Sequence, residues 1–463
     1  MTVSTLLVMA LRFLIIGGGP AGHQAATYAA RLGGKVTVIE KDVVGGAAHL
    51  WDCIPSKAMI ATGGAVSFMK MVEGFGLDAA TGVVDLGGLR ERIGTIATRL
   101  ESSIVQLLES QGVRIIYGTG RFKGPNVIVA ETADGLEEIE ADRVLISTGS
   151  RPRIPDWAEV DHEYILTTRD SYPPPELPSH LVVVGSGVTG VEFVHMFSSL
   201  GSRVTLIVSR QQVLPKKDAE VAAALEENFL ARGVNLLKGA KAIGVDKLPG
   251  GGVRVRCDDG RMVEGSHALL AIGSVANLDN ISLEASGVTL DDRGYPVIAG
   301  HHMQTNVSHI YVGGDVSGKL PLSSVASMQG RKIAEHAMGM HMLEHRHLDY
   351  DMAASAIFTE PEIADVGLPE ADAFAMGRKI RVTKVPFAAS PKAWINNDTR
   401  GFVKILSDPY TGVVLGGSIV GRHAAELIAV IAVAVTNHLK VGDIIDSLLV
   451  HPSLSELLAD AAE

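Results

Sequence analysis

The sequence predicts an α/β protein in which one supersecondary unit occurs twice and is followed by an α+β domain. A β-rich run, a glycine turn, a helix and a second β-rich run follow one another from Phe13 to Glu40. The same order returns from Leu181 to Arg210. Beyond about residue 346, alternating apolar stretches followed by amphipathic helices indicate an antiparallel sheet with helices.

The composition is that of a large globular protein with an acidic surface. With 463 residues, 46% of them hydrophobic and 20% charged, the chain is expected to bury large cores in about three domains. The formal net charge of -11, without any Lys/Arg-rich run, excludes nucleic acid and an anionic membrane surface as partners. Two cysteines, Cys53 and Cys257, and no zinc-like Cys/His spacing predict no metal site and favour a reducing, cytoplasmic location.

Two apolar runs could be mistaken for a signal peptide or a membrane-spanning segment. Leu6 to Ile16 leads directly into a glycine turn and lacks a cleavage site, so we expect a buried strand there. The sequence leaves open whether the chain begins functionally at Met1 or Met9. Leu427 to Val435 is much shorter than the roughly 20 residues that a membrane span needs, so we expect no membrane insertion.

The glycine turn of the first unit has the spacing of a nucleotide-binding turn. Gly17, Gly19 and Gly22 form a GxGxxG pattern between strand and helix, and the next strand ends on Glu40. Such a turn lets a pyrophosphate approach the helix N-terminus, while the acidic residue accepts hydrogen bonds from ribose hydroxyls. The first unit is therefore predicted to be a dinucleotide-binding, Rossmann-like domain, with a plain strand-turn-helix as the alternative.

The second unit repeats this turn at Gly185, Gly187 and Gly190. Each turn is followed by a helix, a strand, a hairpin with an Asp-Gly turn and a strand that ends in LISTGS or LLAIGS. Two dinucleotide sites in one chain suggest electron transfer between two nucleotides.

The residues that end the second strand differ between the two units. Val208 stands where Glu40 stood, and Ser209 and Arg210 follow it. A hydroxyl and a guanidinium suit a 2′-phosphate better than a bare ribose, so we favour NADPH over NADH at this site. NADH stays open, and a solvated loop position is the alternative for Arg210.

Two features lie beyond the second unit. Asp315 follows the apolar strand IYV and precedes a helix that begins near Leu322. Its carboxylate is suited to accept hydrogen bonds from a cofactor's hydroxyls, with helix capping as the alternative role. The apolar helix predicted from Ala424 to Val435 is a candidate dimer face.

Seven motifs spread over almost the whole chain resemble those of the flavoprotein disulfide reductase family, which includes lipoamide dehydrogenase and glutathione reductase. In chain order they are GGGPAG, CIPSK, STGSRPRIP, GSGVTGVEF, YVGGDVSG, FTEPEIADVG and HPSLSE. The resemblance implies FAD in the first unit, NAD(P)H in the second and a homodimer formed through the C-terminal domain. It implies an FAD-binding domain at residues 1–150 and 278–345, an NAD(P)-binding domain at 151–277 and a dimerisation domain at 346–463.

The resemblance also gives roles to single residues. Asp315 would bind the flavin side of FAD, and Lys57 would pair with Glu192 near the flavin N5. His451 would be a catalytic histidine that Glu456 orients and that reaches the partner subunit's active site, with an unpartnered surface histidine as the alternative. The expected cofactor-binding residues are Gly17, Gly19, Gly22, Glu40, Gly46, Lys57, Thr148, Gly149, Gly185, Gly187, Gly190, Ser209, Arg210, Gly273 and Asp315.

The main departure from the family lies in the redox loop. Family disulfide reductases carry two cysteines separated by four residues, whereas here the first position is Ala48 and only Cys53 remains. Cys257 lies in the hairpin of the second unit, so it is an implausible substitute for the missing first cysteine. A dithiol needs two sulfurs within bonding reach, so this loop is predicted not to cycle between disulfide and dithiol. Cys53 is then a structural or electrostatic neighbour of the flavin, and its simplest interpretation is a small buried hydrophobe.

These features predict an FAD enzyme that passes electrons from NAD(P)H directly to a quinone-type acceptor. The residues expected nearest the chemistry are Cys53, Lys57, Glu192, His451 and Glu456. His49 and Trp51 either line the acceptor pocket or only pack the loop. The alternatives are a peroxide or low-molecular-weight disulfide reductase that uses Cys53 alone, a pyridine nucleotide transhydrogenase, and a non-catalytic flavin-binding scaffold or sensor.

Overall fold

The computed structural model describes residues 10–78, 82–340 and 347–463, which form two compact units. Unit 1 consists of the residues up to Pro55, Glu91–Arg151 and Ser274–Tyr350. Unit 2 consists of Ser56–Arg90, Pro152–Gly273 and Asp351–Glu463. Helices α2 (Ile54–Met71) and α3 (Leu86–Ser110) have residues in both. The domain boundaries given above stay predictions.

Unit 1 is organised around a five-stranded parallel sheet in the order β18-β7-β1-β2-β3. Its strands are β1 (Arg12–Ile16), β2 (Lys35–Glu40), β3 (Arg114–Tyr117), β7 (Arg143–Ile146) and β18 (Ile310–Val312). Their residues form nearly continuous apolar runs because both faces of a parallel sheet are buried. The strand predicted before the first glycine turn is confirmed but begins only at Arg12, and Leu6 to Met9 lie outside the described residues.

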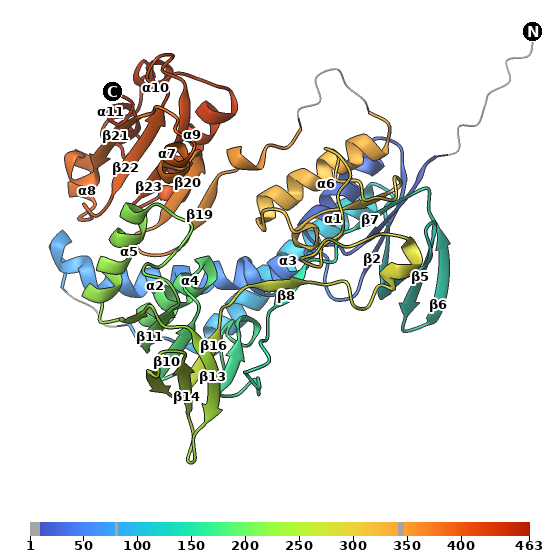
Figure 1. The fold of residues 1–463 in the computed structure, drawn as a ribbon, viewed down its shortest axis with the longest axis horizontal. Coiled ribbons are helices and arrows are strands. Elements are labelled where there is room, and N and C mark those ends of the chain that lie inside the picture. The colour runs from blue at the N-terminus through green and yellow to red at the C-terminus, as the bar shows by residue number, and fades with distance from the viewer. Residues whose placement is uncertain (1–9, 79–81, 341–346) are drawn as a thin grey trace, which may run out of the picture. The chain divides into compact units, whose positions relative to one another are not determined.

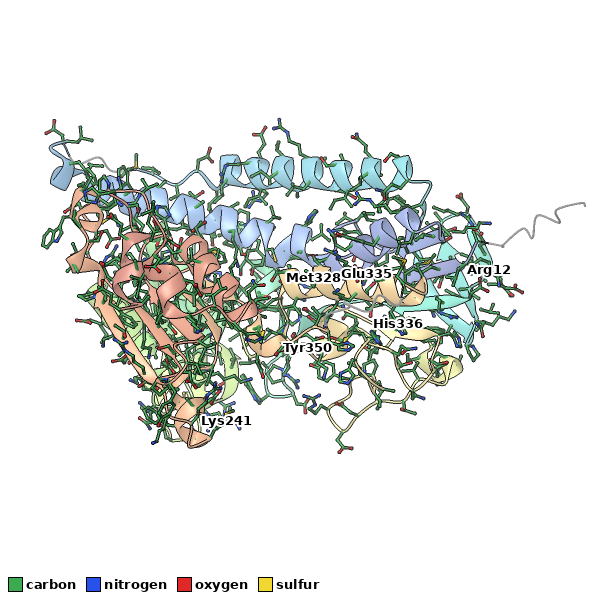
Figure 2. All side chains as sticks on the ribbon, turned by 90° about the horizontal axis from the view of Figure 1, so that it is seen from above. Arg12, Lys241, Met328, Glu335, His336 and Tyr350 are labelled. Carbon is green, nitrogen blue, oxygen red and sulfur yellow. The ribbon has the colours of Figure 1, made fainter. Side chains whose placement is uncertain are left out.

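Helices α1 (Pro20–Arg31) and α6 (Ser323–Ala337) pack along each other beside this sheet (Figure 1). They approach closely because Gly330 has no side chain: a Cβ there would lie 2.1 Å from the carbonyl oxygen of Ala21. Near the end of α6, Nδ1 of His336 lies 2.9 Å from the hydroxyl of Tyr311 on β18. Figure 2 shows Met328, Glu335 and His336 in order along this helix. α6 is thereby anchored both to α1 and to the sheet.

The other strands of unit 1 form small sheets. Strands β4 (Thr119–Gly124), β5 (Val127–Thr132) and β6 (Gly135–Glu140) make an antiparallel meander, and β8 (Ser150–Pro152) pairs with β17 (Ser274–Ala276). The turn between β5 and β6 includes Asp134, and Gly135 of the predicted Asp-Gly pair begins β6, so this hairpin is confirmed.

Unit 2 repeats the architecture with a parallel sheet in the order β12-β11-β10-β16-β9. The strands are β9 (Ile165–Thr167), β10 (His180–Val184), β11 (Arg203–Val208), β12 (Asn235–Lys238) and β16 (His267–Leu270). Helix α4 (Val188–Leu200) follows β10, and α5 (Ala219–Ala231) follows β11. A second meander contains β13 (Ala242–Lys247), β14 (Val253–Cys257) and β15 (Met262–Gly265).

The C-terminal part of unit 2 contains an antiparallel sheet in the order β19-β20-β23-β22-β21. Its strands are β19 (Ser355–Ile357), β20 (Ile363–Gly367), β21 (Arg381–Pro386), β22 (Phe402–Ser407) and β23 (Val414–Val420). Its helices are α7 (Glu370–Ala375), α8 (Pro391–Ile395), α9 (Ala424–Thr436), α10 (Val441–Ile445) and α11 (Glu456–Asp460). The predicted fold class, two Rossmann-like α/β units and a C-terminal α+β domain, is confirmed. Among the described residues, every helix is too short or too polar to cross a bilayer.

Candidate active site

The first glycine turn has the close packing that its spacing predicts. Gly17 has φ +103°, and a Cβ there would lie 2.3 Å from the carbonyl oxygen of Ser147, which directly follows the neighbouring strand β7. A Cβ at Gly22 would lie 1.9 Å from the carbonyl oxygen of Gly17, so α1 rests directly on the turn. Beside Gly19 the corresponding space is open to beyond 4 Å. The turn therefore presents free backbone at the start of a helix, which is the cradle that a pyrophosphate requires.

Glu40 ends β2 beside this cradle. Its Oε2 accepts a 2.6 Å hydrogen bond from the backbone N–H of Gly18, and its Oε1 accepts one of 2.8 Å from Asp42. Burial raises the pKa of the Glu40 carboxyl, although the two backbone donors act in the opposite direction. A buried carboxylate with oxygen lone pairs left over is suited to bind ribose hydroxyls.

Other predicted cofactor residues lie around the same turn. Gly46 packs against Gly19, because a Cβ on Gly46 would lie 3.0 Å from the Gly19 Cα. Thr148 donates a 2.7 Å hydrogen bond to the carbonyl oxygen of Asn277, whose backbone N–H donates to Gly149. These bonds hold the segment that follows β7 in place. The donor set and the open glycine cradle fit a dinucleotide.

Asp315 begins a short 3₁₀ turn (Asp315–Ser317) after β18. Its Oδ2 accepts a 2.8 Å hydrogen bond from the hydroxyl of Ser150. The N-cap of α6 is Leu322, so Asp315 does not cap that helix, and the capping alternative for this residue is wrong. The carboxylate stays available for a ligand group.

Cys53 follows a wide helical turn, Ala48–Asp52, that the loop motif did not predict. The turn is a π-helix, in which the Cys53 N–H donates a 3.3 Å hydrogen bond to the carbonyl oxygen of Ala48, five residues earlier. The Cys53 sulfur lies 3.2 Å from the hydroxyl of Ser323, the first residue of α6. Neither cysteine is in a disulfide: Cys257 is buried in β14, whereas Cys53 is only partly buried. The interpretation of Cys53 as a small buried hydrophobe is therefore wrong, because its sulfur is partly exposed and lies beside a hydroxyl.

The second glycine turn repeats the first. A Cβ at Gly190 would lie 1.8 Å from the carbonyl oxygen of Gly185, and Gly187 again faces open space. The two sheets have the same register: Ile16 pairs with Ile39 in unit 1, and Val184 pairs with Ile207 in unit 2. Val208 is therefore the structural equivalent of Glu40, as the sequence alignment assumed. Ser209 and Arg210 follow β11 with exposed side chains, and Gly273 follows β16 with φ +97°.

Lys57 and Glu192 form an ion pair within unit 2. The Lys57 Nζ lies 3.0 Å from Oε2 of Glu192, which is buried on α4. The other oxygen, Oε1, accepts a 3.0 Å hydrogen bond from the backbone N–H of Phe358, and the Phe358 ring lies 4.8 Å from the Lys57 ammonium. Both oxygens of Glu192 are thus engaged, so the pair is held in one geometry.

His451 and Glu456 are also brought together. The Nδ1 atom of His451 lies 2.8 Å from Oε1 of Glu456, while Oε2 accepts a 2.9 Å hydrogen bond from the backbone N–H of Ser453. This backbone bond and then His451 lower the pKa of the Glu456 carboxyl. The His451 side chain is 69% exposed, so its Nε2 side is accessible. The carboxylate orients the ring, as a catalytic histidine requires.

The predicted residues thus fall into separate groups. Unit 1 contains the first glycine turn, Glu40, Cys53 and Asp315, and unit 2 contains the second glycine turn and the two charged pairs. Sequence reasoning missed the partners Ser150, Ser323 and Phe358, since nothing in the sequence links residues so far apart. Within the described ranges, no cluster of three or more His, Cys, Asp or Glu side chains is arranged to hold a metal.

Comparison with known proteins identifies the family. The family model for pyridine nucleotide-disulphide oxidoreductases matches residues 11–330, and the model for their dimerisation domain matches residues 353–462. The chain belongs to the pyridine nucleotide-disulphide oxidoreductase family. Members of this family bind FAD and use NAD(P)H, so the predicted cofactors are confirmed and the chain is an FAD-dependent NAD(P)H oxidoreductase.

The similar proteins cover almost the whole chain. A Mycobacterium tuberculosis protein named NAD(P)H dehydrogenase (quinone) is 43% identical over 466 residues, which cover 98% of this chain and 94% of that protein. A dihydrolipoyl dehydrogenase of Zymomonas mobilis is 34% identical, with 97% and 96% covered. The crystal structure of LpdA from Mycobacterium tuberculosis superposes with a TM-score of 0.92 at 42% identity and covers 98% of this chain and 99% of its own.

Proposed function

We propose that this protein reduces a quinone-type acceptor with NAD(P)H by direct electron transfer from its flavin, without a redox disulfide. The observation that supports this most strongly is Ala48, which stands where the family has its first redox cysteine, so that Cys53 is the one cysteine of the loop. The relative named NAD(P)H dehydrogenase (quinone) supports the same acceptor class.

The reaction balances without a protein thiol. NAD(P)H gives up a hydride and becomes NAD(P)+, while the quinone takes up two electrons and two protons and becomes a quinol. Bound FAD supplies the two-electron relay between them. The Lys57–Glu192 pair places a fixed charge for the hydride step. His451, oriented by Glu456, delivers the proton that the hydride does not supply.

We further propose a homodimer in which the domain at 346–463 joins two copies, so that His451 of one copy serves the site of the other. The dimerisation-domain match at residues 353–462 supports this arrangement. The apolar helix α9 is the proposed dimer face. Its exposed Val430 and Val433 would otherwise place apolar surface in water.

Replacing Cys53 by serine tests the central proposal. We expect the Cys53→Ser enzyme to keep quinone reduction by NAD(P)H within about threefold of the wild type, because the proposed electron path does not use the sulfur and serine keeps a hydrogen-bonding group at this position. Steady-state kinetics with benzoquinones, lipoamide, glutathione disulfide and peroxide provide the measurement. Cys257→Ser, at a buried strand position, is the matched control for the loss of one thiol.

Two other outcomes would point to the alternatives. A hundredfold loss of quinone reduction in Cys53→Ser, or rapid turnover of peroxide or disulfides by the wild type, would establish a thiol mechanism and contradict the proposal. A flavin that NADPH fails to bleach would leave only a scaffold or sensor. Transfer between NADH and an NADP+ analogue that outpaces quinone reduction would identify a transhydrogenase.

We propose that the enzyme prefers NADPH to NADH because Arg210 binds the 2′-phosphate. A guanidinium donates two charge-assisted hydrogen bonds to a phosphate, so Arg210→Ala is expected to raise the KM for NADPH about tenfold and to leave that for NADH unchanged. Arg254→Ala, which removes an exposed arginine of β14 paired with Glu264, is the control. If Arg210→Ala changed the KM for NADPH and the KM for NADH equally, Arg210 would not bind the 2′-phosphate.

His451→Gln is expected to slow acceptor reduction about tenfold while NADPH reduces the bound flavin at the normal rate. The loss is smaller than the 10² or more typical of a general acid, because the exposed site lets water supply the proton in part. Stopped-flow measurement of each half-reaction separates the two steps. His438→Gln, an exposed histidine of the same domain, serves as the control. Slower flavin reduction in His451→Gln would indicate a structural role instead.

A further inference from the structure

The loop that follows β11 begins with the residues proposed to bind the 2′-phosphate. It runs from Ser209 to Lys217 without helix or strand and leads into α5. Near its start, the carbonyl oxygen of Arg210 accepts a 3.0 Å hydrogen bond from the backbone N–H of Gly239, which directly follows β12. The beginning of the loop is therefore fixed to the edge of the parallel sheet of unit 2.

The middle of the loop lies against the second glycine turn. The backbone N–H of Leu214 donates a 2.8 Å hydrogen bond to the carbonyl oxygen of Ser186 in that turn. Unit 1 has an equivalent contact, in which the Gly45 N–H donates a 3.0 Å hydrogen bond to the carbonyl oxygen of Gly18. In both units, the loop after the second strand is thus held beside the turn that is predicted to receive a pyrophosphate.

The last residues of the loop form one folded segment. The Lys217 N–H donates a 2.9 Å hydrogen bond to the carbonyl oxygen of Leu214 and closes a β-turn. The side-chain amide of Gln212 donates a 3.0 Å hydrogen bond to the carbonyl oxygen of Lys217. The N–H of Val213 donates one of 2.9 Å to Glu226 on α5. A displacement of Lys217 would therefore also displace Gln212, which is close in sequence to Arg210.

The Lys217 side chain connects this segment to two strands of the C-terminal sheet. Its ammonium donates a hydrogen bond to Oδ2 of Asp365 on β20 and one of 3.1 Å to the hydroxyl of Ser355 on β19. The Ser355 hydroxyl donates to the other oxygen of Asp365. The side chains of Lys217 and Asp365 are only 22% and 24% exposed, so solvent ions screen this pair less than a pair at the open surface.

The next residue holds the segment at a different strand. The Asp218 carboxylate lies 2.8 Å from the ammonium of Lys404 on β22. Strands β20 and β22 lie on the two sides of β23 in the sheet. Because Lys217 and Asp218 are adjacent and bind separate strands, any movement of the loop end along the sheet would break one of the two ion pairs.

Arg210 depends on this anchoring because its side chain is exposed. A loop that must become ordered when a ligand binds loses affinity, since ordering costs conformational entropy. We propose that Lys217, held by Asp365 and Ser355, is a positioning residue that keeps the loop in the conformation in which Arg210 binds the 2′-phosphate of NADPH. This inference rests on the proposed NADPH site. Lys217 acts through Arg210 and does not itself contact the nucleotide.

The first test removes either charge of the pair. Lys217→Met keeps an unbranched side chain without the ammonium, and Asp365→Asn keeps the shape of the carboxylate without its charge. Each is expected to raise the KM for NADPH about fivefold, to change the KM for NADH less than about twofold and to leave kcat unchanged with both nucleotides. Steady-state kinetics of the FAD-loaded enzyme with one benzoquinone provide the measurement.

Lys384→Met is the matched control. The ion pair between Lys384 and Glu220 also joins α5 to the C-terminal sheet, but it does not include the loop. Neither KM is therefore expected to change in this variant. An unchanged KM for NADPH in Lys217→Met and Asp365→Asn, or a rise in the KM for NADPH of the same size in Lys384→Met, would overturn the inference.

A double variant separates positioning from the cost of an unpaired charge. Removing one partner of a shielded pair leaves the other charge without compensation, which destabilises the protein by itself. Lys217→Met/Asp365→Leu removes both charges. It is expected to recover the Tm of the FAD-loaded enzyme relative to Lys217→Met and to keep the raised KM for NADPH, because the loop is still not connected to the sheet. Recovery of both quantities would show that only the unpaired charge mattered and would contradict the inference.

Combination with Arg210→Ala distinguishes this inference from the proposed function. In the Arg210→Ala enzyme, Lys217→Met is expected to have no further effect on the KM for NADPH, because Lys217 acts through Arg210. Additive effects, with Arg210→Ala alone still selective for NADPH, would overturn the inference and leave the proposed function in place. Equal effects of Arg210→Ala on NADPH and NADH would overturn the proposed NADPH preference and the inference with it.

Discussion

Replacing Lys404 by methionine is expected to lower the free energy of unfolding by about 3–5 kcal/mol. Lys404 lies on β22 with only 1% of its side chain exposed, and its Nζ lies 2.8 Å from Asp218 and 2.9 Å from Glu370. Burial acts to lower the pKa of Lys404, but the hydrogen bonds that its ammonium donates to Asp218 and Glu370 outweigh burial, and the pKa is raised. Without the cation, the carboxylates of Asp218 and Glu370 repel each other, and the Glu220 carboxylate, which lies 3.4 Å from the same ammonium, adds to this repulsion.

The matched control is Lys384→Met on the adjacent strand β21. Lys384 pairs with Glu220, but both side chains are nearly half exposed, at 45% and 46%. Its loss is expected to cost less than about 1 kcal/mol. Urea unfolding, followed separately by far-UV circular dichroism and by FAD fluorescence, measures both variants. A similar small effect for Lys404→Met would show that the buried cluster contributes little net stability.

Replacing Gly190 by alanine is expected to weaken NAD(P)H binding so far that NAD(P)H hardly reduces the flavin, while the protein keeps its bound FAD. The added Cβ would lie 1.8 Å from the carbonyl oxygen of Gly185, a backbone atom that cannot move aside as a side chain does. Helix α4 must therefore shift, and with it the backbone N–H groups at its start, which we propose bind the nucleotide's pyrophosphate. A cost of roughly 3 kcal/mol corresponds to about 100-fold weaker NAD(P)H binding.

The measurement is the rate at which NADPH bleaches the bound flavin, with dithionite as a reductant that needs no nucleotide site. Gly64→Ala is the control, because a Cβ on this exposed residue of α2 meets no atom within 4 Å. Gly22→Ala is the counterpart in unit 1 and is expected to lose FAD instead. A Gly190→Ala enzyme with normal NADPH affinity would show that the second glycine turn does not hold the nicotinamide cofactor.

Features that depend on neighbouring residues were predictable from the sequence. The two glycine turns follow from local spacing, because the contact between Gly22 and the Gly17 carbonyl involves residues only five apart. The equivalence of Val208 and Glu40 was correct because identical strand and turn lengths fix the same register in both sheets. Ala10 and Leu11, inside the apolar run predicted as a strand, lie outside β1, since apolar character alone does not fix where pairing begins.

The sequence by itself determined the α/β class, the duplicated nucleotide unit, the family and the absence of a second cysteine near Cys53, because each is a matter of composition or short-range spacing. Only the tertiary structure decided which distant groups meet: Ser323 with Cys53, Ser150 with Asp315, and Phe358 with Glu192. It also revealed that the Nδ1 atoms of His23 and His49 are buried without a hydrogen-bond partner among the described residues. Whether a polar atom is satisfied depends on everything packed around it, and that information exists only after the chain has folded.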